Sequence, residues 1–277
     1  MTPTLLALAV LGRGLVDPAE PTVRADDDAL TRGRAVFETL RVYGGRPFRL
    51  REHLVRLAGS AEQVGLDPPP RDELEQLARL ALEAAATPDA VLRFYWTPGP
   101  PDATPTGLVL VSPVPDWIEP ARAMGQRLVS LFHPRRSAPW LLPATKSTSY
   151  AVNMAAEAEA KRRGADDAVF VDADGVVLEG PATNVWWRHG TTLHTPSLDL
   201  GILAGETRAA LVELAAACGY AVEEGTYQLA DLTSADEVFT SSSIREVMPV
   251  IEFDGRAIER GPAADELQAA LRRLATL

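Results

Sequence analysis

One lysine in the middle of the chain has a setting suited to covalent chemistry. Lys146 lies in the segment PATKSTSY, residues 143–150, between a proline-rich stretch and the start of an expected helix. A lysine amine becomes a nucleophile that forms Schiff bases when partial burial lowers its pKa. Taken alone, an exposed loop lysine would have the same sequence setting, so the interpretation of Lys146 depends on its partners.

A candidate partner, Glu179, lies 33 residues further along the chain. It follows three apolar residues, 176–178, and precedes Gly180 and Pro181, which predicts a partly buried side chain. A buried carboxylate needs a partner. The protonated ring nitrogen of a bound cofactor would be one such partner, and an arginine of this chain would be another.

Two segments have the composition of anion-binding sites. Residues 201–207, GILAGET, open an expected helix, where free N–H groups and the helix dipole favour a phosphate. Residues 240–244, TSSSI, place hydroxyl groups at the end of an expected strand and suit a phosphate or a carboxylate. Arg51 heads a helix, where a cation opposes the dipole, so it is a third candidate. A helix cap, a turn and an exposed charge are the respective alternatives.

Other chemistries find little support in the sequence. The single cysteine, Cys218, excludes an internal disulfide and is expected at a helix C-terminus, where the dipole raises a thiol pKa. The sequence has no G-x-S-x-G, P-loop or G-x-G-x-x-G motif. No metal site is expected, because the four histidines lack metal-ligand spacing. These histidines are His53, His133, His189 and His194.

Composition places the chain among globular proteins. Of its 277 residues, 46% are hydrophobic and 23% are charged, and the net charge of −11 argues against a nucleic-acid partner. One cysteine favours a reducing cytoplasm. The apolar run 5–11 is too short to span a membrane and has no basic residue before it, as a signal peptide requires. We therefore expect a cytoplasmic protein without nucleic-acid or membrane partners.

Hydrophobic periodicity predicts the elements that position these residues. Helices are predicted over residues 52–64, 71–86, 150–163 and 206–217. Strands are predicted over residues 5–11, 35–42, 91–96, 107–112, 127–132, 168–171, 176–179, 237–240 and 247–253. The turn 172–175 is expected to join two strands as a hairpin. The chain is therefore of the α+β class.

A change of composition divides the chain. Residues 112–120, SPVPDWIEP, have the composition of a linker. We expect a small N-terminal α/β domain over residues 1–115, a linker over 116–121 and a larger C-terminal domain over 122–277.

Taken in order, these segments resemble the fold-type IV, or class IV, family of pyridoxal 5′-phosphate (PLP) enzymes. This family includes D-amino-acid transaminases, branched-chain aminotransferases, R-selective amine transaminases and aminodeoxychorismate lyase. The resemblance covers about residues 32–255. Six stretches match in the family's order: VFETLRV at 36–42, FRLREHL at 48–54, Lys146 with Tyr150, LEGPATN at 178–184, GILAGETR at 201–208, and ADEVFTSSS at 235–243 running on to Pro249.

The resemblance implies a role for each matched residue. Lys146 would carry PLP as a Schiff base and transfer a proton during the reaction. Glu179 would pair with the pyridine nitrogen, Tyr150 would hydrogen-bond the phenolic oxygen, and Leu203 would cover the ring face. The phosphate would be bound by Arg51, Glu206, Thr207, Ser242 and Ser243. The resemblance also implies a homodimer, and PLP bound mainly by the larger domain.

The chain departs from the family just before its F-E pair. Many members read R-G-x-x-x-G-D-G there, whereas this chain has the shorter TRGRAVF at 31–37, so Arg32 and Arg34 fall near the family's substrate pocket. Strand 91–96 places Arg93 on the same face as Tyr95. Because guanidinium groups bind carboxylates bidentately, we expect one of these three arginines to bind a substrate carboxylate. Phe37, Tyr95 and Ile244 complete the expected substrate-binding residues.

The sequence leaves the reaction open. The arginines favour a transaminase that acts on an amino acid, a D-amino acid first, and a 2-keto acid. The FETLRV stretch and the short chain also fit 4-amino-4-deoxychorismate lyase, which forms 4-aminobenzoate and pyruvate. An R-selective amine transaminase or a branched-chain transaminase is a further alternative, although the polar Arg/Tyr strand suits an aliphatic pocket poorly. A non-catalytic vitamin-B6-binding protein would predict a damaged lysine, glutamate or phosphate site, and these segments are intact.

Overall fold

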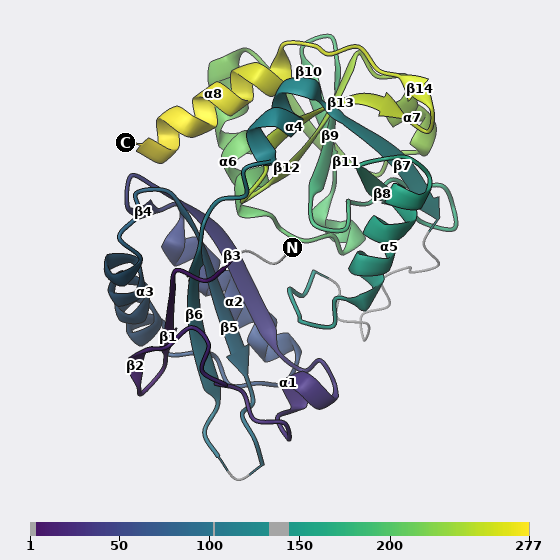
Figure 1. The fold of residues 1–277 in the computed structure, drawn as a ribbon. Helices are drawn as coiled ribbons and strands as arrows, with labels where there is room; N and C mark the ends of the chain where they lie inside the picture. Colours follow the sequence, from purple (N-terminus) through teal and green to yellow (C-terminus); the bar gives the residue numbers. More distant parts are fainter. Residues whose placement is uncertain (1–3, 102, 133–143, 277) are drawn as a thin grey trace. The chain divides into compact units, whose positions relative to one another are not determined.

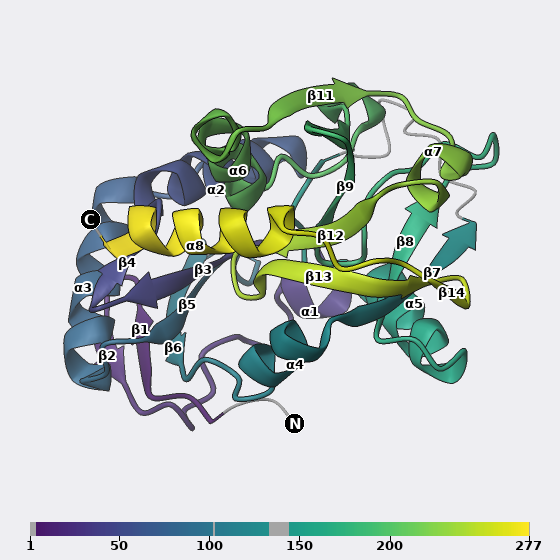
Figure 2. The same ribbon diagram turned by 90° about the horizontal axis from the view of Figure 1, so that it is seen from above.

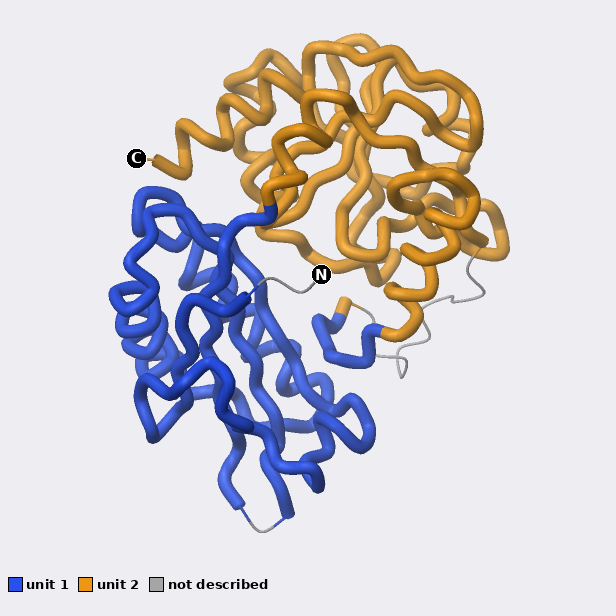
Figure 3. Tube along the Cα trace, in the orientation of Figure 1, with its two compact units in different colours: residues 1–115, 145–150 blue, residues 116–144, 151–277 orange. Residues whose placement is uncertain are grey.

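The computed structural model describes residues 4–101, 103–132 and 144–276, so His133 and Pro143 lie outside the described part of the chain. The chain divides into two compact units, coloured separately in Figure 3. The first comprises residues 1–115 with 145–150, and the second comprises residues 116–144 with 151–277. The first is built on a six-stranded sheet and the second on an eight-stranded sheet.

The sheet of the first unit is antiparallel, and two helices cover one of its faces (Figure 1). The strand order is β2-β1-β6-β5-β3-β4. The strands are β1 Ala7–Val10, β2 Gly14–Val16, β3 Val36–Tyr43, β4 Arg46–Pro47, β5 Ala90–Thr97 and β6 Thr106–Ser112. The helices are α1 Asp28–Thr31, α2 Leu50–Gln63 and α3 Arg71–Ala85, of which α2 and α3 pack on the sheet.

Alternation along the strands explains which face the helices cover. Leu54 and Leu57 of α2 are fully buried against Leu40 of β3 and Leu92 and Phe94 of β5. Successive residues of a strand point to opposite faces. The residues between these core positions therefore point away from α2 and α3. They are Phe37, Thr39, Arg93 and Tyr95, and all are half-buried.

The second unit contains a mixed sheet in the order β11-β10-β9-β12-β13-β7-β8, with β14 paired to β13. The pairs β7–β8, β7–β13 and β10–β11 are parallel, and the other pairs are antiparallel. The strands are β7 Gln126–Phe132, β8 Asp167–Val171, β9 Asn184–His189, β10 Thr192–Pro196, β11 Ala221–Gly225, β12 Glu237–Ser242, β13 Glu246–Phe253 and β14 Arg256–Ala257.

The helices of the second unit are α4 Ile118–Met124, α5 Ala151–Arg162, α6 Glu206–Ala215, α7 Leu229–Thr233 and α8 Ala263–Thr276. Four of these helices, α4, α5, α6 and α8, contact the strands of this sheet. In α8, buried Leu267 and Leu271 recur four residues apart, which is the spacing of one helix face. Figure 2 shows α8 lying along β12 and β13, which it contacts.

Most predicted elements are present, with two corrections. Residues 176–179 do not form a strand: Val176 bridges Gln228 and Val177 bridges Val171, so no continuous ladder forms. The turn before them is present, because Gly175 N donates to Asp172 O at 3.1 Å. The sequence also missed several elements: β2, β4, α1, α4, β9, β10, β11, α7, β14 and α8.

The compact units differ in two places from the predicted division. Residues 145–150, which fall within the predicted second domain, belong to the first unit because they hydrogen-bond to β3 and the residues before it. Helix α4 starts at Ile118, inside the predicted linker 116–121. The assignment of residues 1–115 and 122–277 as separate domains stays a prediction.

Within the described ranges, no helix is long and apolar enough to cross a membrane. No group of three or more His, Cys, Asp or Glu among these residues is arranged to hold a metal ion.

Candidate active site

The segment around Lys146 is fixed by backbone hydrogen bonds to the start of β3. Phe37 N donates to Lys146 O at 3.0 Å, and Thr148 N donates to Ala35 O at 2.8 Å. Lys146 N also donates to the hydroxyl of Ser60 on α2 at 3.3 Å. The loop that carries Lys146 is thus hydrogen-bonded both to the start of β3 and to α2. Its backbone is positioned before any ligand binds.

The Lys146 side chain lies against an aromatic cluster. Its Nζ is 4.4 Å from the ring centroid of Phe37. Phe37 stacks on Tyr95, its register partner on β5, with centroids 5.8 Å apart, and packs edge-on against Tyr150 at 5.5 Å. The structure therefore brings four predicted site residues together. Lys146 itself is half-buried, as its proposed chemistry requires.

Arg93 lies on the same sheet face, two residues before Tyr95. Its Nη1 donates to the Ser112 hydroxyl at 2.9 Å. Burial lowers the pKa of the guanidinium from its ordinary value, and the neighbouring Tyr95 opposes that change. A half-buried cation that is hydrogen-bonded to a neutral hydroxyl suits an incoming carboxylate.

Arg32 and Arg34 are bound to nearby groups of their own loop and of α2. Arg32 forms an ion pair with Asp28 at 3.8 Å and is exposed. Arg34 donates to Val64 O at 3.1 Å and to Gly65 O at 2.6 Å. Both thus contact their own loop and α2, whereas Arg93 shares a sheet face with Tyr95.

Two arginines of α2, the predicted phosphate ligand Arg51 and its neighbour Arg56, have different surroundings. Arg51 is exposed in the first turn. Arg56 is one helical turn before Ser60, which contacts Lys146. Its guanidinium donates hydrogen bonds to the Glu38 carboxylate from Nε and Nη2, at 2.7 Å each. The helix phase explains this difference, because positions 56 and 60 share a face.

Glu38 is the centre of a buried ionic cluster in the first unit. It is fully buried, and its Oε2 lies 2.7 Å from Nδ1 of His53. Burial opposes ionisation of this carboxyl, but the charge and hydrogen bonds of Arg56, with the hydrogen bond to His53, lower its pKa to about 2. The cluster joins β3 to α2. His53 is part of this cluster.

In the second unit, Glu179 is held by the segment that precedes α6. Its Oε2 accepts a hydrogen bond from Leu203 N at 3.0 Å. Its backbone oxygen accepts from Phe170 N of β8 at 2.8 Å, so the residue is positioned by the sheet. The side chain is half-buried, in agreement with the sequence prediction.

The start of α6 forms a narrow cradle. Asn184 Nδ2 donates to Leu203 O at 3.0 Å, and a Cβ added at Gly205 would overlap Asn184 Oδ1. Gly205 is the N-cap and supplies no side-chain hydrogen bond. The first turn contains the predicted residues Glu206 and Thr207, and Thr207 is buried. Amide groups at such a terminus favour an anion.

The remaining predicted residues lie in the turn between β12 and β13. Ser242 pairs with Glu246, so Ser243, Ile244 and Arg245 form a three-residue loop. Ser242 Oγ accepts from Arg245 N at 3.2 Å. Ser243 and Ile244 are half-buried.

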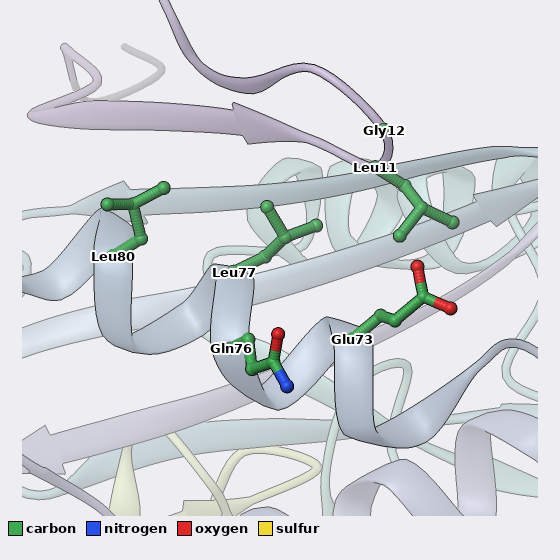
Figure 4. Close-up of a pocket in the computed structure, with 6 residues that line it drawn as sticks. All are labelled: Leu11, Gly12, Glu73, Gln76, Leu77 and Leu80. Atoms are coloured by element: carbon green, nitrogen blue, oxygen red, sulfur yellow. The ribbon is translucent and has the colours of Figure 1, made fainter.

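A pocket of about 220 Å³ also occurs in the first unit, between the β1–β2 turn and α3 (Figure 4). None of the predicted site residues lines it, and we assign it no function. Its lining residues are Leu11, Gly12, Glu73, Gln76, Leu77 and Leu80.

Comparison with protein-family models matches residues 35–253 to the family described as amino-transferase class IV. Among curated relatives, a bifunctional aminodeoxychorismate lyase / D-amino acid transaminase from Mycobacterium tuberculosis is 35% identical over 267 residues, which span 91% of this chain and 92% of the relative. A putative branched-chain-amino-acid aminotransferase from Methanocaldococcus jannaschii is 32% identical over 252 residues, covering 88% and 86% of the two chains.

Aminotransferases of known structure also match this chain. A hypothetical aminotransferase from Mycobacterium tuberculosis, in its α-ketoglutarate and PMP bound form, matches with a TM-score of 0.90 and 35% identity. The match covers 95% of this chain and 98% of that one. The PLP-bound form of the same protein matches equally well.

Proposed function

Because the chain belongs to the class IV aminotransferase family and is a PLP-dependent enzyme, we propose that it moves an amino group between an amino acid and a 2-keto acid, with Lys146 carrying the cofactor. D-amino acids are the proposed donors. The observation that carries the proposal is the fixed, half-buried position of Lys146 against the aromatic ring of Phe37.

The residues present fit this cofactor. PLP has an aldehyde, a ring nitrogen and a phosphate. For these groups the chain offers, in the same order, a lysine amine, a carboxylate held by a backbone N–H, and a glycine-based helix start into which no Cβ would fit. When bound, PLP supplies an electron sink for the carbanion chemistry of transamination.

Lys146 is proposed to act as the base and acid of the reaction through Nζ. Its Nζ lies 4.4 Å from the ring centroid of Phe37, which packs edge-on against Tyr150, so the amine has a defined place beside these rings. The backbone bonds that fix the segment limit the positions that Nζ can reach. Phe37, Tyr95 and Tyr150 would exclude water around it.

Glu179 is proposed to hold a proton on the ring nitrogen of the cofactor. Its hydrogen bond with Leu203 N leaves the carboxylate oriented by the main chain rather than by a flexible side chain. Leu203 is proposed to pack on the ring.

For the phosphate we propose the amides of Glu206 and Thr207, the hydroxyls of Ser242 and Ser243, and Arg51. Arg51 is exposed in the first turn of α2, so its guanidinium is accessible to a ligand, whereas that of Arg56 is bound to Glu38 in the buried cluster.

Arg93 is proposed to bind the carboxylate of the amino acid. The Mycobacterium tuberculosis relative is named as both an aminodeoxychorismate lyase and a D-amino acid transaminase, so the lyase reaction is the second candidate for this chain. Aminodeoxychorismate also carries carboxylates, which means that Arg93 supports either substrate.

A substrate panel separates these functions. The purified protein, loaded with PLP, is mixed in turn with D-amino acids, L-amino acids, R-amines and aminodeoxychorismate, and its long-wavelength absorbance is followed. We expect D-amino acids to remove the band and a 2-keto acid to restore it. Release of 4-aminobenzoate without any response to amino acids would instead assign the lyase activity. A response only to branched-chain L-amino acids would assign the branched-chain reaction.

A further inference from the structure

The turn between β12 and β13 has an unusual backbone. The residue that follows this loop, Glu246, opens β13 with a φ of +56°, in the left-handed region that favours glycine. In three-residue hairpin loops of this kind, glycine is the usual residue at such a position. A glutamate there requires the surrounding structure to impose the conformation.

The Glu246 side chain shows what imposes it. The residue is fully buried, and its Oε2 accepts hydrogen bonds from Arg122 Nη2 at 2.7 Å, Gln268 Nε2 at 2.7 Å and Arg272 Nη2 at 2.9 Å. These donors come from α4 and α8. Three donors around one carboxylate are enough to compensate its burial.

The same donors also bind the main chain of the turn. Arg122 donates to Arg245 O at 2.8 Å and to Val247 O at 3.1 Å. Gln268 Oε1 accepts from Val247 N at 2.9 Å. Backbone groups on either side of Glu246 are therefore bound by the side chains that also bind its carboxylate.

We propose that Glu246 is a positioning residue that holds Ser243 and Ile244 ready for the cofactor phosphate and the substrate. The carboxylate locks the left-handed backbone onto α4 and α8, so the turn is arranged before PLP binds. The apparent affinity for a ligand decreases as the fraction of molecules in the binding-competent conformation decreases. The hydrogen bonds of Glu246 with Arg122, Gln268 and Arg272, here called the clamp, keep that fraction high. The inference rests on the proposed function only in taking Ser243 as a cofactor ligand.

Glycine at this position distinguishes the clamp from backbone strain alone. Glu246→Gly relieves the positive φ but removes the carboxylate. If strain were all that mattered, this variant would bind PLP at least as well as the unchanged protein. If the clamp matters, it loosens the turn. Glu246→Gln keeps the shape and removes the charge, and it should act in the same direction.

The test measures PLP affinity and hydrogen exchange of residues 242–248 in the full chain freed of cofactor. For Glu246→Gly and Glu246→Gln we expect exchange in the turn to accelerate, and the Kd for PLP to rise, each on the order of tenfold. Arg272→Met, whose side chain is 41% exposed, offers a milder change if the first variants fold poorly, with a smaller effect in the same direction.

Asp265→Asn is the matched control. Asp265 lies on α8, is exposed and pairs with Arg260 rather than with Arg122, Gln268 or Arg272, so turn exchange and PLP affinity should stay as in the unchanged protein. Unchanged PLP affinity in Glu246→Gly, faster exchange without weaker binding, or an equal effect of Asp265→Asn would each overturn the proposal. If the unchanged protein fails to bind PLP, the proposed function fails, and the exchange data still decide whether the clamp orders the turn.

Discussion

Replacing Glu38 with glutamine tests the buried ionic cluster that joins β3 to α2. The carboxyl has a pKa of about 2 in the folded protein against an ordinary value of 4.5, because Arg56 and His53 outweigh the cost of burial. A lowered pKa stabilises the fold above the unfolded value and ceases to do so as the pH falls through the folded value. The two values correspond to about 3 kcal/mol near neutral pH.

Glu38→Gln mimics the protonated carboxyl, so its cost should depend on pH. We expect a loss of about 3 kcal/mol in the free energy of unfolding near pH 7, falling to about 2 kcal/mol near pH 3.5. Chemical unfolding, followed by circular dichroism and tryptophan fluorescence at several pH values, measures this difference. A loss that is small at neutral pH, or that does not shrink on acidification, would refute the reasoning.

Glu159 provides the matched control for this experiment. Hydrogen bonds from Arg162 and Arg163 lower its pKa to about 2 as well, but the group is on the surface of α5. Solvent screens exposed ion pairs, so Glu159→Gln should change stability far less than Glu38→Gln. Equal effects would mean that burial does not set the strength of these pairs.

Three further substitutions test the proposed ligand-binding residues. Gly205→Ala should weaken PLP binding by about tenfold or more, because its methyl group overlaps the carboxamide that holds the start of α6, whereas Gly59→Ala in open space on α2 should stabilise the helix by roughly 0.5–1 kcal/mol. Arg51→Gln should raise the Kd for PLP about tenfold, and an unchanged Kd would exclude Arg51 as a phosphate ligand. Arg93→Met should raise the KM for a 2-keto acid by about tenfold or more with the PLP affinity unchanged; an unaltered KM in steady-state kinetics would exclude it as the carboxylate ligand.

The hydrophobic pattern of the sequence predicted those helices and strands whose buried positions follow one regular spacing. Buried positions in α2 recur at helical spacing, and the neighbouring strands β3 and β5 alternate over residues 36–40 and 92–96. Residues 184–189 were missed because NVWWRH is a short apolar run without alternation, which leaves helix and strand undecided. Helix α8 was missed although Leu267 and Leu271 have the right spacing and Asp265 and Glu266 lie in its first turn.

The candidate site was predictable where a motif fixes the residue type. Lys146 and Glu179 were identified from order and spacing, and their half-buried positions agree with that expectation. The role of Arg51 in binding the phosphate rests on the motif and stays a prediction. Glu246 could not be recognised, because its left-handed backbone is imposed by side chains more than a hundred residues away in sequence at Arg122 and by α8.

The central claim is that Lys146 carries the cofactor. Borohydride reduction of the PLP-loaded protein, followed by peptide mass spectrometry, locates the covalent bond directly. We predict a single phosphopyridoxyl group on the peptide that contains Lys146, and its absence from Lys146→Ala together with loss of the long-wavelength absorbance. A modified Lys161 peptide, or an unchanged absorbance in Lys146→Ala, would contradict the account.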